Sequence, residues 1–277
     1  MFKQLLKSPN PVVNHGRRLV DSDLFPKSGL FFSPPEWLEE IDSTNAELKR
    51  RLASGYPPET GFVLAARRQK RGRGRLGNKW LTVDNRDLAF SFLWEVGADF
   101  ETVGTLPMAC ALGICDFLAS PGLEIAARCR WPNDVMTEKG KLAGILTEAF
   151  RTESRIGLIV GIGLNAAESA KRDRRIREAA AIGDFVDDCP GQEEILAKLL
   201  PFLAGRLSIW TRKGFSALKP DLESRLGNVG LPVRVRNAGG VMTGRISGLG
   251  DRGELLLDSE SGTTVATSLA AIDWIEA

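Results

Sequence analysis

The chain has 277 residues, and 37 lysines and arginines face 35 aspartates and glutamates, so its net charge is only +2. This balance excludes a protein that binds nucleic acid through its overall charge, and any basic cluster has to be judged locally. No apolar run approaches the roughly 18 residues that cross a bilayer. The first residues also lack the apolar core of a signal peptide. We therefore expect a cytoplasmic protein with one large and one small domain.

Histidine and cysteine are too sparse to support two common kinds of active site. The only histidine is His15, and the four cysteines (Cys110, Cys115, Cys129 and Cys189) show no C-x-x-C spacing. A zinc site built from these residues is poorly supported. A Ser-His or Cys-His pair would depend on one histidine near the start of the chain. We expect the cysteines to be reduced, small apolar residues of the core.

The chain begins with an irregular segment and then enters its first helix. Residues 1–36 carry Pro, Gly and Ser breakers with little periodicity, which is typical of an extension. The stretch EIDSTNAELKRRLASG then predicts the end of a strand followed by a helix. Ser43 or Thr44 caps that helix, and Gly55 ends it.

The central part of the chain predicts strands and two long helices. The stretch LEIAARCRW alternates in the manner of a half-buried strand, and Pro201 predicts a kink or a break in the second helix. The strands are expected at 61–69, 88–96, 123–131, 141–150 and 155–165, and the helices at 104–120 and 193–210.

The pattern changes near residue 224, where short alternating segments are separated by glycine-rich turns. Three or four such strands within about fifty residues favour a small β-barrel. The expected organisation is therefore an extension (1–36), a catalytic domain (37–223) and a small β domain (224–277).

The stretch RRQKRGRGRLGNKW, residues 67–80, contains the literal dinucleotide-binding pattern G-x-G-x-x-G. That motif requires a helix directly after the glycines, so that the helix N-terminus meets a pyrophosphate. The residues that follow are β-branched and turn-forming and lead into a strand instead. No G-K-[ST] follows the glycines either, so both the Rossmann and the P-loop interpretations are rejected.

Three interpretations of this glycine loop remain open from its residues alone. Its arginines could neutralise nucleic-acid phosphates, although aromatic residues for base stacking are missing apart from Trp80. Its glycines and arginines could instead close over a small anionic ligand, because backbone N–H groups and guanidinium groups bind anions. The loop could also be a solvated basic turn.

Further motifs follow in a fixed order and narrow the choice. They are D-S-T-N at 42–45, G-R-G-R-x-G-x-x-W at 72–80, R-W-P-N-D at 130–134, K-L-A-G-I-L-T-E at 141–148 and G-I-G-L-N at 161–165. Together they resemble the biotin protein ligases, over roughly residues 38–277, in the form without an N-terminal DNA-binding domain. The resemblance implies an α+β fold: a mixed β-sheet flanked by helices, similar to class II synthetases, with a small C-terminal SH3-like β-barrel.

The resemblance also implies a reaction and its partners. Members of this family use ATP to convert biotin into biotinyl-5′-adenylate and then transfer biotin to a lysine of a carboxyl carrier domain, as in acetyl-CoA carboxylase. Mg²⁺ is expected to arrive with ATP, without a protein-built metal site. Neither DNA nor a membrane is expected as a partner. The sequence leaves the oligomeric state open, a homodimer included.

The family's site residues carry over to matching positions of this chain. Arg73, Arg75 and Arg130 are the expected catalytic residues. Some positions also have a plain structural interpretation: Ser43 as a helix cap, Trp80 as a core aromatic, Lys141 as a solvated lysine and Asn165 as a strand-ending turn. The expected biotin-binding residues are Ser43, Thr44, Gln69, Gly72, Arg73, Arg75, Arg130, Gly161 and Gly163, and the expected ATP- or adenylate-binding residues are Trp80, Asn133, Lys141 and Asn165.

The chain departs from the family pattern in the positively charged motifs. Arg130 stands where the family has a lysine, Asn78 where it has an arginine, and Arg71 where it has a small residue. Arginine keeps the charge but is bulkier than lysine and donates through a planar fork. These departures leave room for a lipoate-type or other acyl ligase, or for a degenerate paralogue. A nucleic-acid-binding module that uses the loop arginines and the run KRDRRIR at 171–177 is a third alternative.

Overall fold

The computed structural model describes residues 32–54, 58–83, 85–97, 102–151, 155–168, 179–237, 240–259, 262–266 and 271–274. Three expectations fall outside these residues: most of the 1–36 extension, the end of the first helix at Gly55, and the basic run 171–177. Among the described residues, no helix is long and apolar enough to span a membrane.

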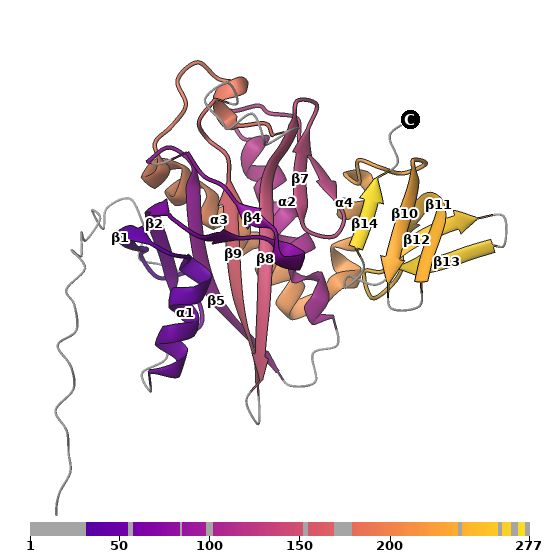
Figure 1. The fold of residues 1–277 in the computed structure, drawn as a ribbon, viewed down its shortest axis with the longest axis horizontal. Coiled ribbons are helices and arrows are strands. Elements are labelled where there is room, and N and C mark those ends of the chain that lie inside the picture. The colour runs from indigo at the N-terminus through magenta and orange to yellow at the C-terminus, as the bar shows by residue number, and fades with distance from the viewer. Residues whose placement is uncertain are drawn as a thin grey trace, which may run out of the picture.

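A seven-stranded mixed sheet forms the centre of the molecule (Figure 1). Its strand order is β1-β2-β5-β9-β8-β7-β6, in which β1 and β2 are parallel and all other neighbours are antiparallel. The strands are β1 (Glu36–Ile41), β2 (Val63–Gln69), β5 (Leu88–Gly97), β6 (Arg128–Arg130), β7 (Asp134–Thr137), β8 (Gly140–Arg151) and β9 (Arg155–Leu164).

Helices cover both faces of this sheet. On one face, α2 (Leu106–Leu118) and α3 (Gln192–Lys213) bury the larger part of the core, while α1 (Thr44–Ala53) packs on the other face with a smaller cluster. Neighbouring residues of a strand alternate between the two clusters, as the twofold period of a strand requires. Short helices complete the fold: η3 (Val103–Thr105), η5 (Ile182–Asp184), η6 (Phe215–Ala217) and α4 (Lys219–Ser224).

Two predictions about these elements were partly wrong. Pro201 does not break its helix, which runs unbroken from Gln192 to Lys213. The proline lies on the exposed side, where the loss of its N–H is tolerated more easily. The strand predicted at 123–131 is reduced to Arg128–Arg130, because Gly122 (φ 90) and Glu124 (φ 52) turn the backbone through the left-handed region.

The glycine loop forms a miniature hairpin. Strand β3 (Gly72–Arg73) pairs antiparallel with β4 (Lys79–Trp80), and the short turn η2 (Arg75–Gly77) connects them. The next element is the long strand β5 and not a helix. The arrangement that a dinucleotide-binding turn requires is therefore missing, and the rejection of that interpretation is confirmed.

A five-stranded antiparallel sheet forms the C-terminal unit. Three or four strands were expected from the sequence, and the structure has five, of which β14 was not predicted. Hydrophobic residues of this sheet, such as Val233, Ile246 and Leu257, belong to the same core cluster as the large domain. The strand order is β13-β12-β11-β10-β14, with β10 (Pro232–Asn237), β11 (Gly240–Leu249), β12 (Leu255–Ser259), β13 (Gly262–Ala266) and β14 (Ala271–Trp274).

Candidate active site

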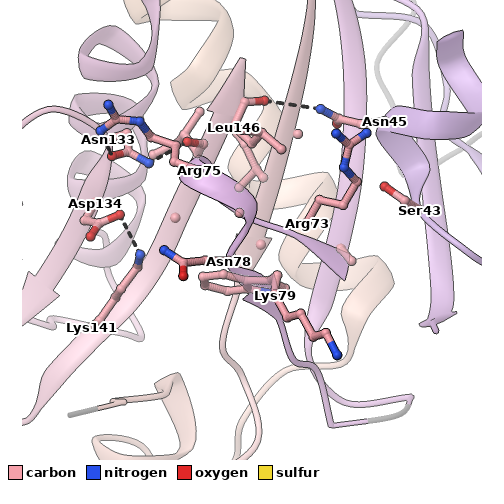
Figure 2. Close-up of a pocket in the computed structure, with 18 of the residues that line it drawn as sticks. Ser43, Asn45, Arg73, Arg75, Asn78, Lys79, Asn133, Asp134, Lys141 and Leu146 are labelled. Carbon is pink, nitrogen blue, oxygen red and sulfur yellow. Dashed lines mark hydrogen bonds and ion pairs between the residues drawn. The ribbon is translucent and has the colours of Figure 1, made fainter. Parts of the chain in front are cut away.

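A pocket of about 350 Å³ lies against the face of the sheet that carries α1 (Figure 2). Its walls come from the start of α1, the glycine-loop hairpin, the turn between β6 and β7, and strands β5, β8 and β9. All of the expected site residues line it except Gly72 and Asn165. Those that do are Ser43, Thr44, Gln69, Arg73, Arg75, Trp80, Arg130, Asn133, Lys141, Gly161 and Gly163.

One end of the pocket is formed by neutral polar groups at the start of α1. The backbone N–H of Thr44 donates to Gln69 Oε1 at 3.0 Å, and the side chain of Ser91 lies 2.6 Å from Thr44 Oγ1. Ser43 occupies the N-cap position, yet its side chain makes no capping hydrogen bond. Ser43 is thus the N-cap residue by position, as predicted, but its side chain does not cap the helix, and this buried residue lies at the pocket wall.

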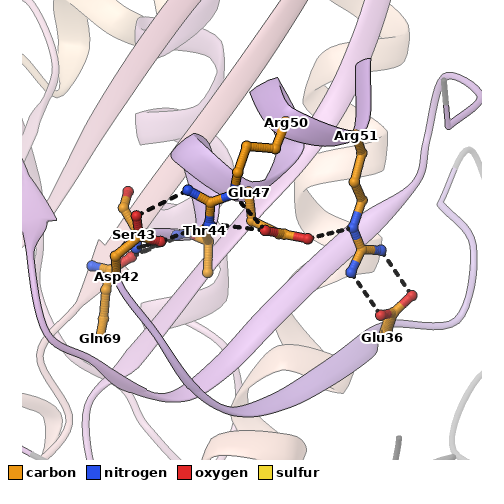
Figure 3. Close-up of polar contacts among 8 residues, drawn as sticks. All are labelled: Glu36, Asp42, Ser43, Thr44, Glu47, Arg50, Arg51 and Gln69. Carbon is orange, nitrogen blue, oxygen red and sulfur yellow. Dashed lines mark hydrogen bonds and ion pairs between the residues drawn. The ribbon is translucent and has the colours of Figure 1, made fainter. Parts of the chain in front are cut away.

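An ion pair holds the loop before α1 in place (Figure 3). Asp42 Oδ1 accepts from the backbone N–H of Ser43 at 2.8 Å, and the guanidinium of Arg50 binds both carboxylate oxygens at 2.8 and 3.0 Å. The hydrogen bond from Arg50 lowers the pKa of Asp42 from 3.8 to about 2. The loop that carries Ser43 and Thr44 is thereby fixed to the helix that follows it.

Two residues at this end were missed in the assignment of roles from the sequence, although both lie within the quoted motifs. Asn45 is buried, and its Nδ2 donates to Glu148 Oε2 at 3.0 Å; Glu148 in turn pairs with Lys49 at 2.6 Å and lies 3.6 Å from Arg73. The Asn45 side chain also occupies the space beside Gly161, where a Cβ would lie 2.2 Å from Oδ1. Gly161 therefore makes room for a protein side chain.

The opposite end of the pocket is cationic. Asp134 bridges Arg130 Nη2 at 3.0 Å and Lys141 Nζ at 2.6 Å, and all three side chains are partly buried. Arg75 Nη1 donates to Asn133 Oδ1 at 3.2 Å, while Asn133 Nδ2 donates to the Ile145 carbonyl at 2.7 Å. These contacts place three positive side chains at one end of the cavity.

Burial changes the pKa of Arg75 more than the neighbouring Asp134 carboxylate does. Desolvation lowers the pKa of its guanidinium, and the nearby Asp134 carboxylate only partly offsets this. Because an arginine stays protonated even then, Arg75 presents an incompletely hydrated positive charge to the pocket. Such a charge binds an anion more strongly than a fully solvated one.

The indole of Trp80 lies on a platform of small residues. Gly144 of β8 and Gly163 of β9 are directly paired, and Ala89 of β5 pairs with Gly163 on the other side. A Cβ on Gly163 would lie 2.2 Å from Trp80 Cε2, and one on Gly144 would lie 2.9 Å from Trp80 Cζ3. Lys141 Nζ lies 5.4 Å from the centre of the ring. The glycine of β9 thus admits the indole, and Trp80 belongs to the pocket wall.

Gly72 and Asn165 shape the site from outside it. A Cβ on Gly72 would lie 2.2 Å from the Trp80 carbonyl oxygen, so glycine is needed for the hairpin. The buried Asn165 donates through Nδ2 to the carbonyl oxygens of Lys141 and Ala180, each at 3.0 Å. It therefore holds the backbone of Lys141, and its side-chain amide makes protein contacts.

The described residues contain no group of three or more His, Cys, Asp or Glu side chains that could hold a metal ion. What the pocket offers is a neutral hydrogen-bonding end, a cationic end and an aromatic wall. Such a site can position an acid and a phosphate group against each other and offset their negative charges.

Known proteins with similar sequences and structures point in one direction. Residues 37–165 match the biotin/lipoate A/B protein ligase family. The chain is 32% identical over 235 residues to the biotin–[acetyl-CoA-carboxylase] ligase of Mycobacterium tuberculosis, covering 83% of this chain and 85% of that protein. It is 29% identical to the ligase of the same name from Paracoccus denitrificans, covering 82% of this chain and 95% of that protein.

A solved structure agrees with these sequences. The biotin protein ligase from Aquifex aeolicus in complex with biotin and ATP superposes with a TM-score of 0.76 at 30% identity, covering 88% of this chain and 100% of the other. The fold expected from the sequence, a mixed sheet with flanking helices and a small C-terminal β unit, is confirmed. The ordered motifs, the fold and these relatives agree, and the chain belongs to the biotin protein ligase family.

Proposed function

We propose that this chain activates biotin with ATP and transfers it to a lysine of a carboxyl carrier protein. The observation that carries the proposal is the polarity of the pocket, with neutral polar groups around Thr44 at one end and Arg130, Lys141 and Arg75 at the other. A molecule with an uncharged ring and a carboxylate at the end of a chain fits this polarity in one orientation only. The ligases named above support the same substrate.

The first step joins two anions. A carboxylate oxygen of biotin attacks the α-phosphorus of ATP, and the bond to pyrophosphate breaks. Because both partners are negative, their approach is opposed by Coulomb repulsion, and Arg130, Lys141 and Arg75 stand where they reduce it. No protein nucleophile or histidine takes part, and positioning with charge compensation provides the rate.

The second step releases AMP. The amine of the acceptor lysine attacks the acyl carbon of the adenylate, the bond to the phosphate oxygen breaks, and the amine proton is lost to solvent. The glycine-loop hairpin borders the pocket and presents Arg73 and Arg75 toward it. We assign it the role of a lid that retains the reactive adenylate until the acceptor arrives.

Mg²⁺ is expected to enter with the phosphates of ATP, whose charge it would neutralise. The acid closest to the cationic end, Asp134, is already engaged by Arg130 and Lys141, which fits an ion held by phosphate oxygens better than one held by the protein. We also place the enzyme in the cytoplasm, where ATP is supplied and free thiols such as those of Cys110 and Cys115 stay reduced.

The test is a two-stage assay with the full chain. Biotin, ATP and Mg²⁺ should yield pyrophosphate and biotinyl-adenylate, detected by mass spectrometry. An added apo carrier domain of a biotin-dependent carboxylase should then gain one biotin, whereas a carrier whose target lysine is arginine should not. Lipoate is offered as a competitor. A folded preparation that binds no biotin, or that activates lipoate in preference to it, would overturn the proposal.

A further inference from the structure

A carboxylate lies behind the neutral end of the pocket, and the reaction described above does not use it. Glu148 accepts hydrogen bonds from Asn45 through Oε2 and from Lys49 through Oε1, and Arg73 lies near Oε1. Burial raises the pKa of Glu148, but the hydrogen bonds from Lys49 and Asn45 together with the charges of Lys49 and Arg73 outweigh it and hold the pKa below its ordinary value. The group is therefore an anion at neutral pH, and an anion can only accept hydrogen bonds.

This carboxylate fixes the orientation of the Asn45 amide. The donor Nδ2 must face Glu148 Oε2 at 3.0 Å, and the Leu146 carbonyl at 3.4 Å favours the same orientation (Figure 2). The acceptor Oδ1 is thereby turned toward Ser91, whose Oγ lies 2.6 Å away. Two acceptors at that distance would repel each other, so Ser91 has to donate its only proton to Asn45.

The direction of the next hydrogen bond follows. Ser91 Oγ also lies 2.6 Å from Thr44 Oγ1. With its own proton already given to Asn45, Ser91 can only accept there, so Thr44 donates to Ser91 across 2.6 Å in preference to Gln69 Oε1, which lies farther away at 3.3 Å. The Thr44 hydroxyl is then left with lone pairs alone for any other partner. Thr44, Asn45 and Ser91 are each at least nine-tenths buried, so bulk water does not compete for these hydrogen bonds and their directions are kept.

We propose that Glu148 is a positioning residue that, through Asn45 and Ser91, makes the Thr44 hydroxyl a hydrogen-bond acceptor toward the pocket and so selects an acid whose ring carries an N–H. The inference rests on the proposed function, since the ureido ring of biotin carries two such groups. A ring oxygen in place of the N–H would meet the lone pairs of Thr44 and be repelled. Glu148 thus acts on specificity without lining the pocket.

A glutamine at position 148 should reverse this order. Lys49 and Arg73 both face Oε1 and can only donate, so the single carbonyl oxygen of the glutamine would turn toward them. Its NH₂ group would then face Asn45, whose amide has to flip and present Nδ2 to Ser91. Ser91 would donate to Thr44, whose own proton would turn toward Gln69 Oε1 at 3.3 Å or toward the pocket, and one of its lone pairs would be taken by Ser91.

The test measures binding by calorimetry for biotin and for two analogues, each with one ring N–H replaced by oxygen. The wild-type chain should prefer biotin over the analogue whose oxygen faces Thr44. In Glu148→Gln this preference should fall by about tenfold, the worth of one buried hydrogen bond. Ser91→Ala interrupts the chain in the middle and should lower the preference as well.

Glu47→Gln is the matched control. Glu47 lies on α1, the helix that also carries Thr44 and Asn45, and it binds Arg50 and Arg51 (Figure 3). Because it does not contact Asn45, Ser91 or Thr44 through its side chain, Glu47→Gln should leave the preference unchanged. An unchanged preference in Glu148→Gln overturns the inference, and if that variant does not fold, an unchanged preference in Ser91→Ala does so. A wild-type chain that binds no biotin would instead refute the proposed function, so the two failures are distinct.

Discussion

Gly163 lies beneath the indole of Trp80, and an alanine there tests how strictly the pocket depends on that contact. The added Cβ would lie 2.2 Å from Trp80 Cε2 and 2.3 Å from Nε1, whereas carbon atoms in contact stay roughly 3.5 Å apart. The indole must therefore move by about 1 Å or more. The hairpin is largely exposed and can shift, so the loss of stability should stay near the lower end of the ~1–3 kcal/mol typical of overpacking.

Activity should suffer far more than stability. A displacement of about 1 Å at a positioning group can cost on the order of 100-fold in rate. We therefore expect Gly163→Ala to form the adenylate about ten- to a hundredfold more slowly than the wild-type chain. The assay is pyrophosphate release at varied ATP concentration, alongside the melting temperature. We expect the KM for ATP to rise while the melting temperature falls by only a few degrees, about 2–4 °C per kcal/mol.

A second glycine provides the control. Gly205 lies in α3, and nothing stands within 4 Å of the Cβ that an alanine would add. Gly205→Ala should stabilise the protein by about 0.5–1 kcal/mol, because alanine loses less backbone freedom in a helix, and activity should not change. If Gly163→Ala retained the wild-type rate and KM for ATP, the reasoning about the Trp80 platform would be refuted.

Three further predictions concern charged residues. Arg75→Ala should release the adenylate about tenfold faster or more, the worth of a charge-assisted hydrogen bond, which is seen as labelling of bystander lysines; unchanged retention would contradict the lid role. Arg130→Lys should keep or raise activity, because lysine preserves the charge beside Asp134, whereas a loss above about tenfold would show dependence on the guanidinium. The pKa of Asp42 is lowered from 3.8 to about 2, so its pair with Arg50 stabilises the fold above pH 4 and loses this effect as the pH falls toward 2. Melting curves of Asp42→Asn should lack that acid slope, and identical profiles would show that the pair contributes nothing.

The sequence located most of the pocket because its residues occur in short motifs with strand spacing. Gly161 and Gly163 are two apart, so they had to share one face of a strand, and the structure places both on the pocket wall. The rejection of a dinucleotide-binding turn also followed from the missing helix signal after Gly77. Local chemistry was sufficient in each of these cases.

Other features depended on partners that lie far away in the sequence. Glu148 meets Asn45 across 103 positions, and Ser91 meets Asn45 across 46; no local pattern shows which side chains face each other across strands. The function of the glycines was incompletely predicted for the same reason. The sequence showed that these glycines leave space above the strand. It did not show that the side chains of Asn45 and Trp80 fill that space.

The contact between Trp131 and the C-terminal unit has a consequence for biosynthesis. Trp131, next to the cationic end of the pocket, donates through Nε1 to the carbonyl oxygen of Gly253 at 2.9 Å, and both regions share one core. A chain emerging from the ribosome exposes all the pocket motifs about ninety residues before Gly253 is made, at roughly 5–20 residues per second. For those seconds the site lacks the support of this hydrogen bond and of the shared core, so we expect the turn that carries Trp131 to be held less firmly until the C-terminal unit has been made.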